Sequence, residues 1–332
     1  MSAVGVQAPA PVDPDLLEPV LRPLAAARTL PGVVYASPAV FAWERAHFLD
    51  GSWVCVGRGD EVAALGDQRA VVAGSTSVLL VRDDAGDLRG FFNACRHRGH
   101  ELLEPGTRRR GRGIRCPYHD WVYGLGGECR AVPRFGKDTG AEPHLAELAL
   151  VPARVAEWHG WVFANVSGDA PPLAEHLGNA DLVVEPYRPQ RLVLGARHGY
   201  EVAANWKLVV ENYLECYHCT PIHPELCAVT PPDSGRGYPQ QPVAADRTRV
   251  ECSWYFPPEA RERAGFDPGY AADFWDLVNR QDWAACESVQ RNATSPGWRQ
   301  GPFSPWEDDV HAVMAAVARG YSTGRLGPVA LG

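Results

Sequence analysis

Short apolar runs separated by turn residues dominate the chain between about residues 50 and 166. The runs WVCVG, AVVAG, SVLLVRD, GFFNAC and WHGWVFANV predict strands at Trp53–Gly57, Ala70–Gly74, Ser77–Asp83, Gly90–Cys95 and Trp158–Val166. The piece DDAGDL between two of these runs is rich in residues that favour turns. Closely spaced strands of this kind predict a small all-β domain.

The periodicity changes after residue 166. LVLGARHGYEVAA and RTRVECSWYF read as strands, and apolar residues recur at helical spacing in NWKLVVENYLECYHC, Tyr270–Glu287 and Trp306–Ala318. Strands followed by helices favour an α+β fold here. A short helix is expected at Ala39–Phe48, after a Pro- and Ala-rich start with little periodicity. We therefore predict an N-terminal arm at 1–38, an all-β domain at 39–166 and an α+β domain at 167–332.

Composition narrows the classes of protein. The chain has 332 residues, 45% of them hydrophobic, and a net charge of −8, which argues for a folded core and against a nucleic-acid partner. No apolar window is long enough for a membrane span, and the first residues contain Pro and acids where a secretory signal has basic and apolar ones. We expect a cytoplasmic protein. Its nine cysteines, an odd number, argue against a disulfide framework and leave metal ligation open.

Cysteine and histidine are paired twice, in CRHRG and in CPYHDW. The spacing is Cys95-x-His97, then 18 residues, then Cys116-x2-His119. Two thiolates and two imidazoles in tight clusters can ligate one metal centre, either a zinc ion or an iron–sulfur cluster. Structural zinc sites of this composition usually have wider spacers within each pair. A Rieske [2Fe–2S] centre needs two thiolates on one iron and two imidazoles on the other, and each loop can supply one of each.

CRHRGHEL and CPYHDW, with VYGLGG and VPRF, resemble the Rieske domain of Rieske non-haem iron oxygenases. The resemblance assigns Cys95, His97, Cys116 and His119 as cluster ligands. Asp120 departs from the family pattern, which usually has a small residue such as Gly there; a carboxylate at this position can lower the cluster potential or contact a partner. The intervening run RRRGRG is either a solvated loop or a docking surface for an acidic electron donor.

A second constellation lies in the other half of the chain. Glu215 and His218 fall on the polar stripe of NWKLVVENYLECYHC, and Pro221 breaks the helix so that His223 can turn toward His218. Two histidines and one carboxylate form the facial triad of oxygen-activating non-haem Fe(II) sites. The spacing Glu215-x2-His218-x4-His223 resembles the acid-x2-His-x4-His signature of the same oxygenase family.

The resemblance also implies the third ligand. In QDWAACESVQ, Asp282 with Gln290 eight residues later resembles the family's ligand aspartate segment, and Asp276, Asp308 and Asp309 are the alternatives. The metal ligands are then His218, His223 and Asp282.

The resemblance gives Glu215 a different role, as a bridging carboxylate. In the family, subunits form rings, and this carboxylate joins a Rieske-ligand histidine to an iron-ligand histidine of the neighbouring subunit. We therefore expect a homotrimer. Most members have Asp at this position, and Glu within ENYLECYHC resembles the subgroup that acts on glycine betaine, stachydrine, carnitine and choline. The resemblance extends from about Tyr35 to Tyr321 and implies a helix-grip fold, an antiparallel sheet around a long helix, for the second half.

The implied function is that of an oxygenase component. It would use a Rieske [2Fe–2S] cluster, mononuclear Fe(II) and O2 to hydroxylate or N-demethylate a small quaternary amine, held over aromatic faces such as Trp254, Tyr255 and Phe256. Because the chain has no convincing GxGxxG after a strand, NAD(P)H would act only through a separate reductase, with or without a ferredoxin. The alternatives are a ring-hydroxylating oxygenase for an aromatic or larger substrate, a Rieske electron carrier, and a structural zinc module.

Overall fold

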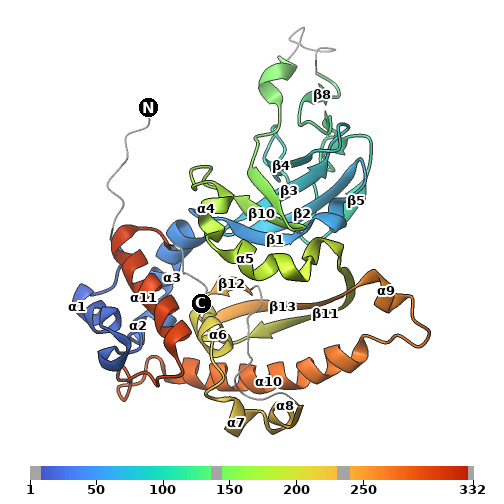
Figure 1. Cartoon of the computed structure of the whole chain (residues 1–332). Helices are drawn as coiled ribbons and strands as arrows, with labels where there is room; N and C mark the ends of the chain where they lie inside the picture. The colour runs from blue at the N-terminus through green and yellow to red at the C-terminus, as the bar shows by residue number, and fades with distance from the viewer. Residues whose placement is uncertain (1–8, 136–143, 230–239, 328–332) are drawn as a thin grey trace. The chain divides into compact units, whose positions relative to one another are not determined.

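The computed structural model describes residues 9–135, 144–229 and 240–327 (Figure 1). The chain divides into two compact units. The β unit is Leu49–His176, and the mixed unit joins Met1–Phe48 to Leu177–Gly332. No helix in the described ranges is both long and apolar enough to span a membrane.

The described residues of the β unit form three antiparallel sheets. The largest has the order β4-β3-β2-β5, with β2 at Asp67–Ala73, β3 at Thr76–Arg82, β4 at Leu88–Phe92 and β5 at Arg108–Arg110. The second has the order β1-β10-β9, with β1 at Val54–Arg58, β9 at Arg154–Trp158 and β10 at Trp161–Asn165. The third has the order β6-β7-β8, with β6 at Ile114–Arg115, β7 at Val122–Tyr123 and β8 at Cys129–Ala131. The all-β prediction for this region is confirmed.

One of the predicted strands is wrong. We expected a single strand over Trp158–Val166, whereas the chain reverses at His159 and Gly160 and forms the hairpin of β9 and β10. Both turn residues have positive φ, 46° for His159 and 82° for Gly160. Positive φ at both central residues is the geometry of the two-residue hairpin turn that matches strand twist, and Gly in the second position makes it accessible.

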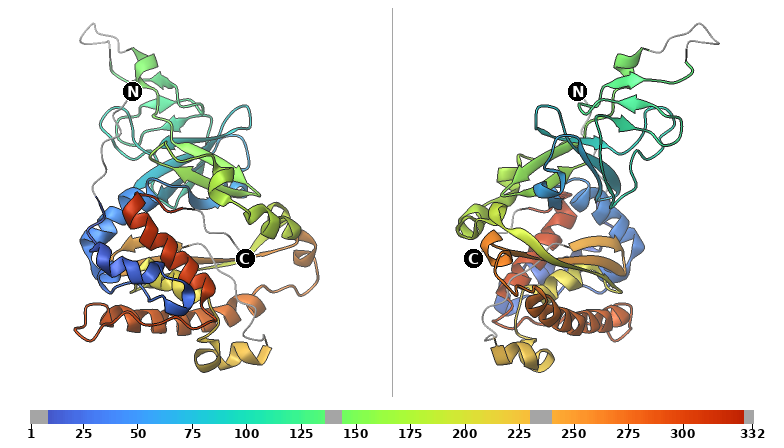
Figure 2. Two further views of the ribbon diagram at one scale, coloured as in Figure 1. Left: turned by 60° about the vertical axis from the view of Figure 1, so that its left-hand side comes forward. Right: turned by 90° about the vertical axis from the view of Figure 1, so that its right-hand side faces the viewer.

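The mixed unit is built on a three-stranded antiparallel sheet in the order β11-β13-β12. Its strands are β11 at Val193–Val202, β12 at Gln240–Ala244 and β13 at Arg247–Phe256. The long helix α10, Gly269–Asn292, runs beside this sheet in every view (Figures 1 and 2). Trp283 and Cys286 of α10 bury in the same core as Tyr200 and Cys252 of the sheet. A sheet with a long helix across it fits the helix-grip expectation.

The remaining elements are all shorter than α10, and most have eight residues or fewer. The α-helices are α1 at Pro14–Leu17, α2 at Val33–Ala36, α3 at Pro38–Glu44, α4 at Leu173–Leu177, α5 at Ala180–Val184, α6 at Trp206–Tyr213, α7 at Cys219–Ile222, α8 at Pro224–Val229, α9 at Pro258–Arg261 and α11 at Asp308–Thr323. The single-turn elements are η1 at Glu18–Leu21, η2 at Leu24–Ala26, η3 at Arg45–Leu49, η4 at Gly59–Val62, η5 at Leu145–Leu148, η6 at Glu185–Tyr187 and η7 at Pro189–Arg191.

The segment expected to be a single helix over NWKLVVENYLECYHC is interrupted. Helix α6 ends at Tyr213, and α7 begins only at Cys219. Between them, the Glu215 carboxylate accepts a hydrogen bond from the backbone N–H of His218 at 3.1 Å. A side chain that takes up a backbone donor in this way competes with a continuous helical ladder. The break places Glu215 and His218 in a turn rather than on a helix face.

The N-terminal residues differ from the expected loose arm. Leu17, Val20, Leu30 and Val40 are buried in the same core as α10 and α11. This apolar side of the segment therefore belongs to the mixed unit, and residues 39–48 join it rather than the β unit. Burial of several large side chains explains the difference, because short helical turns with little periodicity can still pack well once a partner surface exists.

Candidate metal centres

The two Cys/His loops of the β unit have the same backbone design. In the first, the Cys95 N–H donates to the His100 carbonyl at 2.8 Å; in the second, the Cys116 N–H donates to the Trp121 carbonyl at 2.9 Å. Gly99 and Asp120 occupy corresponding positions, four residues after each cysteine, with φ of 71° and 64°. Each loop thus presents a cysteine and a histidine from one tight turn.

The donor atoms of the two loops converge. Cys95 and Cys116 are buried at 3% and 2% exposure, and His97 and His119 are half-buried. The Nδ1 atoms of the two imidazoles lie 3.2 Å apart. Buried thiols with imidazoles nearer the surface suit a Rieske cluster, whose histidine-bound iron is the outer one. The residues present therefore fit a [2Fe–2S] group of this type.

Two aromatic residues support the loops, and the sequence analysis had not singled them out. The Tyr123 hydroxyl lies 3.1 Å from Cys95 Sγ and accepts a hydrogen bond from the Arg96 N–H at 3.0 Å. The Trp121 ring stacks on His97 with centroids 4.8 Å apart and planes at 9°. Hydrogen bonds to a ligand sulfur are one way in which a protein tunes a cluster potential.

Asp120 takes the left-handed position that glycine takes in the other loop. This conformation favours Gly, and Asn and Asp tolerate it better than other residues. The Asp120 carboxylate is paired with the Arg115 guanidinium. The negative charge that we expected to act on the cluster or on a partner is therefore partly compensated within the same loop.

Two arginines of the run RRRGRG are held in the fold by hydrogen bonds of their side chains. Arg109 donates to the Gln68 side chain at 2.9 Å and Arg110 to Asp67 at 2.6 Å, and residues 108–110 form the edge strand β5. Arg108 and Arg112 are exposed, and within the described residues no ion pair involves them.

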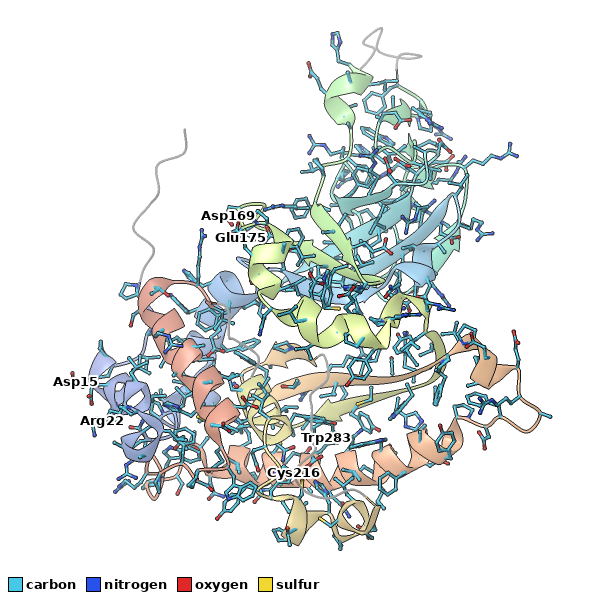
Figure 3. All side chains as sticks on the ribbon, viewed as in Figure 1. Asp15, Arg22, Asp169, Glu175, Cys216 and Trp283 are labelled. Carbon is cyan, nitrogen blue, oxygen red and sulfur yellow. A yellow bond between two sulfur atoms is a disulfide. The ribbon has the colours of Figure 1, made fainter. Side chains whose placement is uncertain are left out.

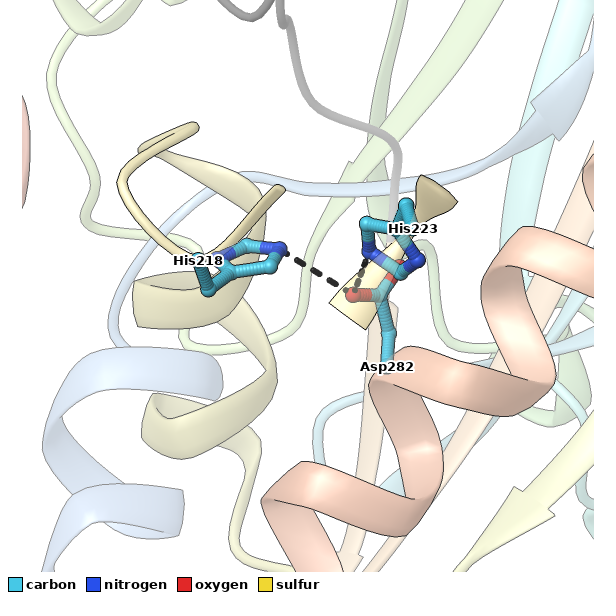
Figure 4. Close-up of side chains that lie close together, drawn as sticks. All are labelled: His218, His223 and Asp282. Carbon is cyan, nitrogen blue, oxygen red and sulfur yellow. Dashed lines mark hydrogen bonds and ion pairs between the residues drawn. The ribbon is translucent and has the colours of Figure 1, made fainter. Parts of the chain in front are cut away.

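In the mixed unit, His218, His223 and Asp282 come together (Figure 4). His218 precedes α7, His223 follows it, and Asp282 projects from α10. One ligand atom from each residue lies within 4.8 Å of the others. His223 and Asp282 are 1% and 5% exposed, so the group is largely shielded from water.

The two distances from Asp282 to the histidines fit neighbouring ligands of one small cation. Asp282 Oδ1 lies 3.2 Å from His218 Nε2 and 2.8 Å from His223 Nε2. Metal–ligand bonds of about 2.1 Å at right angles place neighbouring donors roughly 3 Å apart. Two imidazoles and one carboxylate on one side of the ion are the donor set of non-haem Fe(II) oxygenases. The residues present therefore fit mononuclear Fe(II).

The orientation of His218 is set by Glu215. His218 Nδ1 lies 2.6 Å from Glu215 Oε1, and because a carboxylate only accepts, Nδ1 carries a proton and Nε2 is the nitrogen that faces Asp282. Burial lowers the pKa of His218, but hydrogen bonds to Asp282 and Glu215 outweigh it and raise this pKa to about 9. The carboxylates of Glu215 and Asp282 therefore stabilise a positive charge at this site.

Asn212 borders the same site. Its Nδ2 lies 3.5 Å from His218 Nε2, and its buried Oδ1 has no hydrogen-bond partner within the described part of the chain. A buried carbonyl oxygen without a donor is costly unless another group completes the site. This residue was not singled out from the sequence, although it belongs to the ENYLECYH stretch.

The alternative aspartates lie elsewhere. Asp276 accepts from the Tyr200 hydroxyl at 2.8 Å and from Arg280 at 2.7 Å. Asp308 and Asp309 are in the first turn of α11. None of the three belongs to the group formed by the two histidines, whereas Asp282 does.

A disulfide joins Cys216 and Cys219, on either side of Tyr217 and His218 (Cys216 is labelled in Figure 3). The odd number of cysteines had argued against a disulfide framework. This one link closes a single turn and connects no distant segments, and the other seven cysteines are free. It spans the break between α6 and α7, directly beside the candidate iron ligand.

Gln281 and Gln290 also contribute to the site from α10. Gln281 Oε1 lies 2.7 Å from His223 Nδ1. Gln290, noted only for its spacing from Asp282, accepts from the Asn205 N–H at 2.9 Å and so holds the start of α6. The one signal in the sequence for Gln281 is its position next to Asp282, because consecutive helical residues point about 100° apart and can face the same site from two sides.

Comparisons with known proteins agree with this architecture. Residues 52–151 match the Rieske [2Fe-2S] domain, and residues 189–242 and 232–323 match the ring hydroxylating alpha subunit (catalytic domain). The carnitine monooxygenase oxygenase subunit of Acinetobacter pittii is 37% identical over 209 residues, which cover 59% of this chain and 53% of that protein. The glycine betaine monooxygenase oxygenase subunit of Pseudomonas aeruginosa is 30% identical over 369 residues, with 83% of this chain and 85% of that protein covered.

A solved structure is similar over nearly the whole chain. The crystal structure of the quaternary ammonium Rieske monooxygenase CntA in complex with L-carnitine superposes with a TM-score of 0.79 at 26% identity, covering 93% of this chain and 99% of that one. The chain belongs to the Rieske non-haem iron oxygenases, as an alpha (oxygenase) subunit. Within that family its relatives are quaternary-ammonium monooxygenases. The sequence match spans about half the length of some of these relatives.

Proposed function

We propose that this chain is the oxygenase component of a multicomponent Rieske system. It takes electrons from a separate reductase and hydroxylates or oxidatively N-demethylates a small quaternary amine of the glycine betaine or stachydrine type. The observation that carries this proposal is the buried group of His218, His223 and Asp282 in a chain that also has a Rieske domain. An electron carrier would not need that second donor set.

The proposed iron ligands are His218, His223 and Asp282, and the proposed cluster ligands are Cys95, His97, Cys116 and His119. When bound, the cluster supplies electrons and the Fe(II) supplies reductive activation of O2. The protein holds the Nε2 atoms of both histidines toward Asp282 and keeps the site largely shielded from water. Hydroxylation of an N-methyl group gives a carbinolamine, which breaks down to formaldehyde and the demethylated amine.

We propose Glu215 as the link to the neighbouring subunit. Its carboxylate already orients His218 through Nδ1, and its side chain keeps 12% exposure. Each carboxylate oxygen retains a lone pair that can accept a second N–H, such as that of a Rieske-ligand imidazole from another copy of the chain. This role rests on the homotrimeric ring that we propose; inter-subunit electron transfer is described for a similar quaternary ammonium Rieske monooxygenase, 25% identical in sequence.

Aromatic side chains on α10 and on the elements packed against it are our candidates for holding a cationic substrate. Trp283 directly follows Asp282 and lies between α10 and the three-stranded sheet (Figure 3). Its ring centroid is 5.7 Å from those of both Tyr200 and Tyr213. Quaternary ammonium groups bind well over such faces. The stretch Trp254–Phe256 is less suitable as a unit, because successive residues of β13 point to opposite faces of the sheet.

For the electron donor we propose a reductase with an acidic docking face. Arg96 and Arg98 flank the ligand His97 and are exposed, and Arg108 and Arg112 add charge nearby in the sequence. Opposite charges speed the encounter of redox partners and make its rate depend on salt. We place the protein in the cytoplasm: one link joins Cys216 and Cys219, but the other seven cysteines form no disulfide, and two of those seven are the proposed cluster ligands.

The deciding experiment is a substrate screen with a surrogate reductase. Oxygen uptake, NAD(P)H consumption and formaldehyde release are measured together for glycine betaine, stachydrine, carnitine, choline and a set of aromatic compounds. We expect one quaternary amine to give equal oxygen uptake and formaldehyde release. Coupled turnover of an aromatic compound without formaldehyde would instead establish the ring-hydroxylating alternative.

Variants connect the activity to the site. His218→Ala and His223→Ala should keep the cluster absorbance and lose turnover, and retained turnover would rule out the triad. Glu215→Gln should retain both metals and slow electron transfer in a single turnover.

Arg112→Glu should slow reduction of the cluster, whereas Arg263→Glu, an exposed control in the mixed unit, should not.

A further inference from the structure

We infer that Gln281 is a positioning residue that fixes the tautomer and orientation of His223, with Glu225 as its anchor. The inference rests on the proposed iron site and deepens it. No motif in the sequence marks either residue. Two hydrogen bonds in sequence connect the buried His223 to Gln281 and Gln281 to Glu225, which lies at the surface on α8.

The outer step determines the inner one. Gln281 Nε2 lies 3.2 Å from Glu225 Oε2. A carboxylate can only accept, so the amide must direct its NH2 group toward Glu225 and its carbonyl oxygen toward His223. That carbonyl, 2.7 Å from His223 Nδ1, can only accept as well. Nδ1 therefore carries an imidazole proton, and Nε2 is the nitrogen that faces the other candidate ligands and gives up its proton when a metal binds.

The result matches the geometry on the other side of the ring. His223 Nε2 lies 2.8 Å from Asp282 Oδ1, on the side where the three candidate ligands converge. His223 itself is 1% exposed, so water cannot readily replace a lost partner of Nδ1. Two consecutive residues of α10 thus act on one site. Gln281 holds His223 through Nδ1, and Asp282 is itself a candidate ligand.

The two histidines are oriented by different chemistry. The partner of His218 Nδ1 is the Glu215 carboxylate, and the partner of His223 Nδ1 is the neutral Gln281 amide. An anionic acceptor makes an imidazole more electron-rich than a neutral one does. Because Gln281 is uncharged, it orients its histidine without adding a further negative charge to a site that already holds Asp282 and Glu215.

The test measures metal binding, independently of any substrate. Full-length protein carrying its cluster is titrated with Fe(II) in competition with a ferrous chelator, for wild type and for Gln281→Met, which has a similar length and no acceptor. We expect affinity for mononuclear Fe(II) to fall about 10- to 100-fold, as is typical when the outer partner of a ligand histidine is removed. Ala284→Met places the same side chain at an exposed position of α10 and should bind as wild type does.

A reversed pair distinguishes positioning from mere packing. In Gln281→Glu combined with Glu225→Gln, the carboxylate at 281 accepts from His223 Nδ1 and also from the new amide at 225, so the proton stays on Nδ1. We expect this double variant to bind Fe(II) with an affinity within about threefold of wild type. A change of that size can be distinguished from the loss of about 10-fold or more expected for Gln281→Met. Wild-type affinity in Gln281→Met, or no recovery in the double variant, would overturn the inference.

His223→Ala separates this inference from the proposed function. If His223→Ala loses mononuclear Fe(II) while Gln281→Met retains wild-type affinity, the iron site stands and the role of Gln281 falls. If His223→Ala also retains the iron, the proposed site itself is wrong. Cluster absorbance, recorded in every variant, reports whether the fold has survived.

Discussion

A buried ion pair ties the N-terminal segment to the helix that leads into the iron site, and we expect its disruption to be severely destabilising. Glu44 of α3 is fully buried, and Lys207 of α6 is 2% exposed. Glu44 Oε1 accepts from Lys207 Nζ at 2.7 Å and from the Tyr321 hydroxyl, and Oε2 accepts from Trp206 Nε1 at 2.9 Å. Burial lowers the pKa of Lys207, and the Glu44 carboxylate opposes that shift.

The change Glu44→Gln removes the charge with little change of shape. Breaking a buried pair by neutralising one partner costs about 3–5 kcal/mol, because the other charge remains buried and uncompensated. All three partners of Glu44 are donors, so a glutamine NH2 must face one of them, which adds to the loss. For a unit of this size each kcal/mol lowers Tm by about 2–4 °C, which gives a decrease of roughly 6–20 °C.

Calorimetry of wild type, Glu44→Gln, Lys207→Met and the double variant measures this effect. Removing both charges should recover much of the loss, because a buried pair contributes little more than its apolar replacement. The reasoning fails if Glu44→Gln unfolds within 2 °C of wild type, or if the double variant loses the sum of the two single losses.

Three further predictions concern single sites. Asp282→Ala should abolish mononuclear iron binding while Asp309→Ala keeps it, as measured by iron content per cluster; the opposite pattern would reassign the third ligand. Burial raises the pKa of Glu211 to about 8, from an ordinary value of 4.5, so its neutral form is favoured in the folded state. Stability should therefore fall as pH rises between these values, by up to about 1.4 kcal/mol per pH unit, and Glu211→Gln should flatten the profile of Tm against pH; an unchanged slope would contradict this. Asp120→Asn should raise the cluster potential in a redox titration and Arg115→Gln should lower it, with the double variant near wild type, because the paired charges offset each other; equal shifts in one direction would refute this.

Part of the candidate site was predictable because it is local. The cluster ligands occupy two tight turns, and the turn geometry around Gly99 and Asp120 follows from a few residues each. His218 and His223 are five positions apart, on either side of the short helix α7; Pro221, which we expected to break the helix, lies within α7, and the break falls before it. Spacing within such short segments limits where side chains can point, so residue type and interval are enough to predict the chemistry.

Other features depended on packing between distant segments. The choice of Asp282 over Asp276 is set by which face of α10 meets the α6–α7 turn, and the contact of Gln281 with His223 follows from the same approach. The hairpin turn at His159 was missed because a non-glycine residue with positive φ leaves no clear sequence signal.

By itself the sequence determined the class of each centre: the paired Cys/His loops and the two spaced histidines specify their chemistry through short-range geometry. Tertiary structure alone decided that the N-terminal segment is part of the core, where Glu44 meets Lys207, and which carboxylate and which amide complete the site around His223. The physical reason is that burial and hydrogen-bond pairing between segments far apart in the chain depend on how whole surfaces fit, and no local pattern encodes that fit.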